Sequence, residues 1–212
     1  MKEFFVDVES TGTDPSMNGV WQIAGMIVSG EKFVPFDYKA APFKGDVIEP
    51  IALEMSGMTE EELFKLPHPI EVHKEFTKLL GAHVNKYDKL DKYLFYAYNA
   101  RFDSDMLRAW FSKCGDKYFG SWFWTPPICV MATAAFHLAK ERPAMANFKL
   151  ETVMRWLGIT IDGKDGEFHA ADVDIAYTYK LAQYLRANYP QVVSYNTNDY
   201  LAGHPMDGGV KR

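Results

Sequence analysis

The sequence of 212 residues has little cysteine, no excess of positive charge and no long apolar run. Its two cysteines, Cys114 and Cys129, cannot form a framework of disulfides, and they lack the spacing of a cysteine metal site. Its apolar segments are shorter than the ~20 residues of a membrane-spanning helix. The apolar run Phe4–Val6 is also too short for a signal peptide. We therefore expect a reduced, cytoplasmic protein with no membrane partner.

The shortage of positive charge limits the function classes further. The chain carries 23 basic and 28 acidic residues, a formal net charge of −5. Proteins that grip long nucleic acids through phosphate contacts normally carry a basic footprint, which is missing here. By contrast, apolar residues are plentiful, at 48% of the chain with 15% aromatics. This composition predicts one domain over residues 1–189 and a polar, extended or loosely ordered tail over 190–212.

Apolar periodicity predicts an α/β fold without internal repeats. Strands are expected near 4–9, 20–29, 32–38 and 93–98, and the segment 121–128 leads into or contains another short strand. Helices are expected near 51–56, 59–65, 69–82, 103–114, 129–141 and 148–157, with a last helix that ends near 185. Three antiparallel strands followed by strands alternating with helices are typical of a mixed sheet that helices cover.

Two carboxylates occupy alternate positions where the first strand ends. Asp7 and Glu9 follow the apolar run Phe4–Val6, and strand residues two apart project to the same face. Like charges in a partly buried place repel each other and lose hydration. A hard divalent cation with oxygen ligands would relieve both effects. The alternative is an ordinary exposed acidic strand end.

A third carboxylate begins the helix that follows the fourth strand. Met106, Leu107 and Trp110 mark the apolar face of that helix, and Asp103 lies at its head by the same period. Asp105 falls on the opposite, solvent side. Asp103 therefore points toward the core or a cleft, or it serves as the N-cap of the helix.

The last helix carries a fourth carboxylate. Its apolar face holds Tyr177, Leu181 and Leu185, and Asp174 lies on the same stripe, where it needs a cation or a hydrogen-bond partner. Asp172 lies off the stripe and fits simple N-capping. His169 is five residues before Asp174, too far for helical alignment, so we place it on the glycine-rich loop that precedes the helix.

Together these segments resemble the three motifs of the DEDD superfamily of 3′–5′ exonucleases, in its histidine-bearing subgroup. The matching elements are Asp7-x-Glu9-x-Thr11-Gly12, Asn99-x-x-Phe102-Asp103 and His169-x4-Asp174, and the resemblance spans roughly residues 4–186. The group includes the proofreading subunit of bacterial replicative DNA polymerase, ribonuclease T and oligoribonuclease. The resemblance implies a ribonuclease H-like fold with a mixed five-stranded sheet flanked by helices.

The resemblance also implies a two-metal mechanism. Asp7, Glu9, Asp103 and Asp174 would hold two divalent metal ions, Mg²⁺ or Mn²⁺, which stabilise the attacking and leaving oxygens of a phosphoryl displacement. His169 would act as the general base. The implied substrate is the 3′ end of single-stranded DNA or RNA, released as nucleoside 5′-monophosphates. Such a small footprint on a strand end suits the acidic net charge.

Six further residues are candidates for contact with the terminal nucleotide. The backbone around Ser10, Thr11 and Gly12 would approach the 3′-hydroxyl, and Asn99 would orient that region. Relatives often have a His-Gly-Ile/Leu-Thr stretch that touches the nucleotide, where this chain has Ser56-Gly57-Met58-Thr59. Met58 is the candidate from this stretch, and Ser56 replaces the usual histidine. Phe102 is either a core residue or a stacking partner for the terminal base.

Three alternatives stay open at this point. The protein could be a noncatalytic nucleic-acid-binding relative, or a proofreading module that docks to a polymerase through residues 190–212. A homodimer is also possible. The aromatic cluster Trp122–Trp124 fits the core, an oligomer contact or a base-stacking platform.

Overall fold

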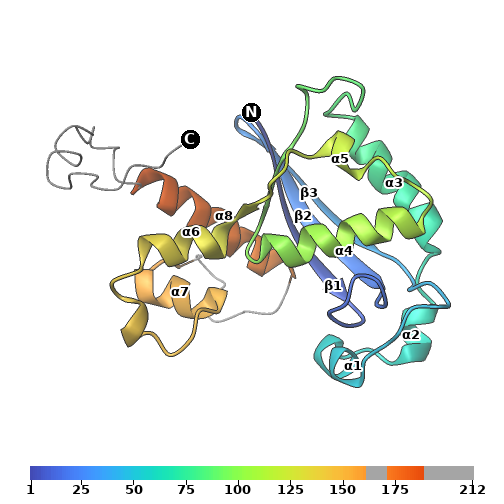
Figure 1. Cartoon of the computed structure of the whole chain (residues 1–212), viewed down its shortest axis with the longest axis horizontal. Helices are drawn as coiled ribbons and strands as arrows, with labels where there is room; N and C mark the ends of the chain where they lie inside the picture. The colour runs from blue at the N-terminus through green and yellow to red at the C-terminus, as the bar shows by residue number, and fades with distance from the viewer. Residues whose placement is uncertain (161–170, 189–212) are drawn as a thin grey trace, which may run out of the picture.

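One mixed sheet forms the centre of the molecule (Figure 1). The computed structural model describes residues 1–160 and 171–188. In that part of the chain the strands are β1 (Lys2–Ser10), β2 (Val20–Ser29), β3 (Lys32–Lys39), β4 (Leu94–Ala97) and β5 (Ile128–Cys129). Their spatial order is β3-β2-β1-β4-β5. The pairs β1–β2 and β2–β3 are antiparallel, and β1–β4 and β4–β5 are parallel. The predicted mixed five-stranded sheet is confirmed.

Helices fill the connections between and after the strands. They are α1 (Pro50–Ser56), α2 (Glu60–Phe64), α3 (Pro69–Gly81), α4 (Ala100–Lys113), α5 (Phe119–Trp122), α6 (Val130–His137), α7 (Leu150–Leu157) and α8 (Ala171–Ala187), with a 3₁₀ turn at Arg142–Ala144. Two boundaries differ most from expectation. Helix α4 begins at Ala100 rather than at residue 103, and α6 ends at His137 rather than at residue 141. The C-cap of α6 is Leu138, whose backbone N–H donates to the Ala134 carbonyl.

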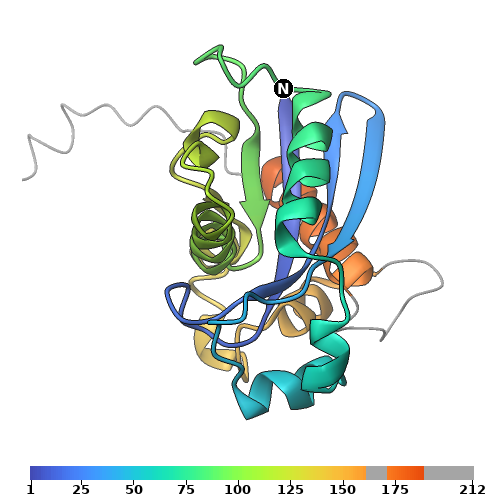
Figure 2. The ribbon, with the colours of Figure 1, turned by 90° about the vertical axis from the view of Figure 1, so that its right-hand side faces the viewer.

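The two faces of β1 pack against different helices. Phe4, Val6 and Val8 belong to the core that contains residues of α3 and α4, whereas Phe5 belongs to the core with residues of α8. Figure 2 shows α3 in front of the sheet and α8 behind it. The alternation of a strand therefore places Asp7, two residues after Phe5, on the α8 face.

The α3–α4 face of the sheet is filled by aromatic rings. Phe4 stacks on Phe36 at 5.1 Å between ring centroids and lies 5.0 Å from Phe123. Trp122 and Phe123 are buried, and only Trp124 of this cluster is substantially exposed, at 38%. Trp122 and Phe123 are therefore core residues, and a three-residue stacking platform at this segment is wrong.

Helices of the described segments are all too short or too polar to cross a lipid bilayer. The expectations for the tail 190–212 fall outside the described residues.

Candidate active site

Asp7 and Glu9 lie near the carboxyl end of β1, at the middle of the sheet. Asp7 pairs with Ala24 of β2 and Glu9 with Gln22, and the pairing register shifts directly after Glu9. Both side chains are half-buried. An exposed acidic strand end is therefore wrong, because these carboxylates lie against the packed interior.

Asp103 is almost fully buried, at 4% exposure, and joins α4 to β1. Its Oδ1 accepts a hydrogen bond from the backbone N–H of Val8 at 3.1 Å. The N-cap alternative is wrong, because Asn99 occupies that position and Asp103 lies one turn inside the helix. Asp105 is exposed and lies 3.7 Å from Arg101 in an ion pair, so the helical phase separated the two aspartates correctly.

Asp174 reaches the same site from the first turn of α8. Burial, followed by the charges of Glu9 and Asp174, raises the pKa of Asp7 to about 7. Burial and then the charge of Asp7 raise the pKa of Asp103 well above its ordinary value. Because charges act on one another only when close, all four predicted carboxylates belong to one electrostatic cluster. His169 lies outside the described residues.

The loop after β1 is built from internal hydrogen bonds of Thr11. Its N–H donates to the Gly19 carbonyl at 2.8 Å, and its hydroxyl donates to the Val47 carbonyl at 2.7 Å. Its own carbonyl accepts from the N–H of Glu49 at 2.8 Å. Since these hydrogen bonds engage the polar groups of Thr11 and tie the loop to the segment before α1, Thr11 contributes to the site by fixing the loop that presents Gly12.

Gly12 occupies a position without room for a side chain. A Cβ there would lie 2.3 Å from Asn18 Nδ2 and 2.3 Å from Glu49 Oε1. The hydroxyl of Ser10 donates to the Gly12 carbonyl at 2.6 Å, which closes the turn. Glycine is therefore required here by close packing.

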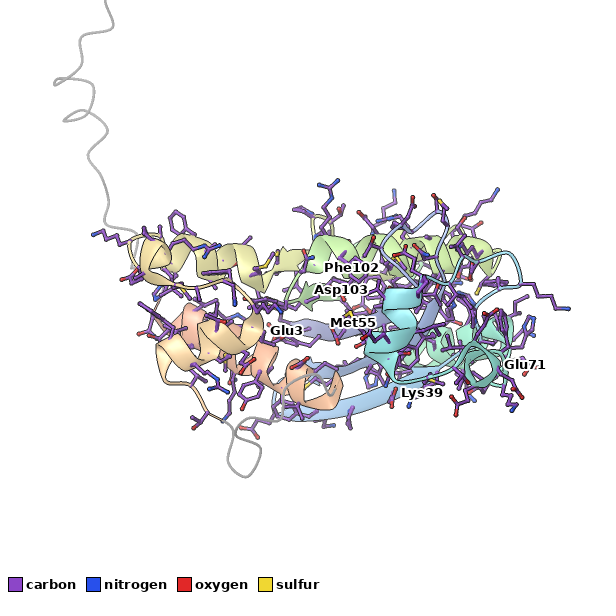
Figure 3. All side chains as sticks on the ribbon, turned by 90° about the horizontal axis from the view of Figure 1, so that it is seen from below. Glu3, Lys39, Met55, Glu71, Phe102 and Asp103 are labelled. Atoms are coloured by element: carbon purple, nitrogen blue, oxygen red, sulfur yellow. The ribbon has the colours of Figure 1, made fainter. Side chains whose placement is uncertain are left out.

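The remaining predicted contact residues differ in exposure. Asn99 is exposed at the start of α4, and Phe102 is half-buried and packs against the aromatic core. Figure 3 labels Phe102 beside Asp103 on α4. Met58 is half-buried after α1. Phe102 thus packs against the core and keeps a partly accessible ring, and its contact with the terminal base stays a prediction.

Sequence reasoning missed a brace that holds the 11–19 loop. Lys113, in the last turn of α4, donates to the Asn18 carbonyl at 2.6 Å and pairs with Asp46 at 2.5 Å. Buried Asn18 in turn donates to the Val47 carbonyl at 2.9 Å. These contacts join residues 29 to 95 positions apart, and no local pattern in the sequence marks them.

The donor chemistry of the cluster fits hard divalent cations. Four carboxylates offer only oxygen, which Mg²⁺ and Mn²⁺ prefer. Burial first, and then the neighbouring carboxylates, raise the pKa values of Asp7 and Asp103, and a bound cation would favour their charged forms. Within the described residues, no three acidic, histidine or cysteine side chains are already arranged as ligands.

Comparison with known proteins gives the site a family context. The model of the family described as Exonuclease matches residues 4–182. A DNA polymerase III of PolC type from Bacillus cereus is 27% identical over 185 residues, which are 85% of this chain and 11% of the polymerase.

Solved structures share the fold. The zinc-bound complex of Escherichia coli exonuclease I with single-stranded DNA matches with a TM-score of 0.68 and 20% identity, over 96% of this chain and 43% of that one. The same enzyme with a dT13 oligonucleotide matches with the same TM-score and identity, over 96% of this chain and 44% of that one. The chain thus spans less than half of the exonuclease I chains and about a tenth of the polymerase. The fold is the ribonuclease H-like fold of these exonucleases.

Proposed function

This chain belongs to the exonuclease family of the DEDD superfamily, which makes it a nuclease, and we propose that it is a metal-dependent 3′–5′ exonuclease. It would shorten single-stranded DNA or RNA from the 3′ end and release nucleoside 5′-monophosphates. The observation that carries the proposal is the cluster of Asp7, Glu9, Asp103 and Asp174, in which burial and mutual repulsion raise the pKa of Asp7.

Two divalent ions held by these carboxylates would neutralise the charge that develops on the phosphate. The protein groups have separate tasks. His169, in the histidine-bearing subgroup, would take the proton from the attacking water. The loop at Gly12 and the side chain of Met58 would bracket the terminal nucleotide, with Asn99 orienting the region of the 3′-hydroxyl. The oxygen of the attacking water then bonds to the phosphorus of the last linkage, and the bond from that phosphorus to the 3′-oxygen of the preceding nucleotide breaks. The 3′-oxygen takes up a proton, and the phosphate stays on the released nucleoside 5′-monophosphate.

A polymerase-associated role is the second candidate. The observation that favours it is the match to a PolC-type polymerase, of which the aligned residues are only 11%. In that case the chain would remove mismatched 3′ ends while bound to a polymerase partner. The discriminating measurement compares the rate of the isolated chain with its rate after the polymerase is added. If the chain docks to the polymerase, the rate should rise severalfold.

A ladder assay tests the principal proposal. A 5′-labelled strand of DNA or RNA, single- or double-stranded, is incubated with Mg²⁺, with Mn²⁺ or with chelator. We expect progressively shorter labelled strands with either metal, and intact strands in chelator. A strand that ends in a 3′-phosphate should resist, because it adds charge in a site made for a free hydroxyl. Immediate release of a labelled mononucleotide, cuts within a circular strand or full activity in chelator would each refute the proposal.

A further inference from the structure

A groove of about 720 Å³ opens on the α8 face of the sheet, beside the candidate active site. Its volume lies within the range of ligand-binding sites. Its floor is made by alternate residues of two paired strands, Gln22, Ala24 and Met26 of β2 and Asp37 and Lys39 of β3. One wall comes from the second turn of α8, and the other from α1 and the residues that follow it.

The groove is continuous with the catalytic carboxylates. Glu9 lines it, and so does Met58. Among the described lining residues, neither the 11–12 turn nor Asn99 and Phe102 of the α4 end is present. The groove therefore begins at Glu9 and Met58 and extends over β2 and β3, away from Gly12, Asn99 and Phe102. A strand that crosses the carboxylates would continue into it.

The charge of the groove fits a phosphate at one place. Lys39 is the single cationic side chain among the described residues that line it. Lys39 is exposed and forms no ion pair within the described part of the chain. The neighbouring carboxylate of Asp37 accepts a hydrogen bond from the Gln22 amide at 2.8 Å. Lys39 is thus available to an incoming anion.

The wall of the groove carries a largely exposed apolar side chain. Helix α1 has no buried residue at all. Met55 is 82% exposed and lines the groove, while Ile51, one turn earlier, is 63% exposed and does not line it. Figure 3 labels Met55 on α1 and Lys39 near the same helix. A flexible thioether at the wall of a groove suits contact with the flat face of an aromatic base.

We propose that this groove binds the nucleotide on the 5′ side of the scissile phosphate, with its 5′-phosphate at Lys39 and its base against Met55. This inference rests on the proposed function, because it assigns the strand that the carboxylates would cleave. The ligand class is an unpaired polynucleotide, DNA or RNA, longer than two nucleotides. The groove would thereby add affinity for single strands in a protein with few other basic contacts.

Equilibrium binding tests the groove independently of hydrolysis. Fluorescence anisotropy is measured with labelled strands of two, three and eight nucleotides, each with a methylphosphonate as its last linkage to prevent cleavage. DNA and RNA strands form separate arms. The variants are Lys39→Gln and Met55→Ser. Their matched controls are Lys32→Gln, at the far end of the same strand, and Ile51→Ser, on the same helix but outside the groove.

For the wild-type chain we expect affinity to rise from two to three nucleotides, where the additional phosphate reaches Lys39. Lys39→Gln should weaken binding of the eight-nucleotide strand by about three- to tenfold and lower the slope of log affinity against log salt by ~0.7. Met55→Ser should weaken it by a similar factor without changing the salt slope. Both controls should bind like the wild type.

The groove assignment would be overturned if Lys39→Gln left the salt slope of binding unchanged. It would also be overturned if the variants and their controls lost affinity equally. The ladder assay is run on the same wild-type preparation. A chain that binds through Lys39 but does not cleave would contradict the proposed function alone. A chain that cleaves normally but binds independently of Lys39 would contradict the groove alone.

Discussion

Two acidic residues on one face of β1 meet opposite surroundings. Glu3 and Asp7 are four positions apart, so both project toward α8. The carboxylate of Glu3, which is buried, accepts a hydrogen bond from Arg186 at 2.6 Å, and Arg186 also donates to the Tyr96 hydroxyl. Asp7 instead faces the charges of Glu9 and Asp174. The same helix thus neutralises one buried acid near its last turn and adds negative charge to the other at its first turn.

The difference separates an acid that is paired inside the protein from an acid that we propose to bind metal. A buried carboxylate that is paired with arginine is satisfied and needs no other ligand. A half-buried carboxylate among other carboxylates is destabilised until a cation arrives. Burial alone does not mark the site, since both acids lie against the packed interior. The sign of the neighbouring charges does.

We expect the largest effect when Asp7 is replaced, and this effect is on the rate of strand hydrolysis. Asp7→Asn should reduce exonuclease activity by at least about 10³-fold, because the loss of a ligand removes several kcal/mol of charge stabilisation. Its fold should persist, since the change also removes repulsion. Activity is measured on a 5′-labelled strand, and folding by circular dichroism. A variant with near wild-type activity would contradict the role of Asp7.

Replacement of the proposed base is expected to have the next largest effect. His169→Ala should cost about 10²–10⁴ in rate, while the metal concentration needed for half-maximal activity stays nearly constant. A large shift in that concentration would instead make His169 a ligand. Asp105→Ala and Asp172→Ala are the controls, and both should retain most of the activity.

The pH dependence of stability sharpens the comparison without catalysis. Because the folded protein holds the proton of Asp7 up to about pH 7, whereas an unfolded aspartate loses it near 3.8, stability should fall as pH rises between these values. The loss should be on the order of a few kcal/mol in chelator and should be largely reversed by Mg²⁺. Thermal unfolding from pH 4.5 to 8 measures it. Asp7→Asn should flatten the curve, and an equally steep curve in that variant would assign the effect elsewhere.

The smallest effect is expected at the structural end. Arg186→Met leaves the Glu3 carboxylate buried without its cation and should lower the free energy of unfolding by about 1–3 kcal/mol at pH 7. The rate on a labelled strand, measured well below the unfolding temperature, should stay close to the wild-type value. Urea titration supplies the free energy. If Arg186→Met lowered the rate and left the stability unchanged, the Glu3–Arg186 pair would act in hydrolysis rather than in folding.

Local patterns in the sequence predicted most of the site for simple geometric reasons. The period of a strand put Asp7 and Glu9 together, and the period of a helix separated Asp103 from Asp105 and placed Asp174 on the buried stripe. The ends of the helices were harder to predict from the sequence. Helix α4 starts three residues earlier than expected, because Asn99 rather than Asp103 precedes its first turn.

Long-range contacts were not accessible from any local pattern. The brace from Lys113 to Asn18 and Asp46 joins parts of the chain that have no pattern in common. Similarly, the cluster Trp122–Trp124 has the same composition whether it is core or surface. Whether this cluster is buried depends on whether Phe4 and its neighbours present an apolar face that it can cover.

The sequence by itself determined the α/β order of elements, the mixed sheet and the identity of the four acids, because these follow from periodicity and residue type within short segments. Only the tertiary structure decided which acids share a site. The register of β1, the packing of α4 against it and the direction of α8 bring Asp174 to Asp7 and Arg186 to Glu3. Charge interactions depend on distance in space, and a chain that folds back on itself sets those distances through contacts that no local segment contains.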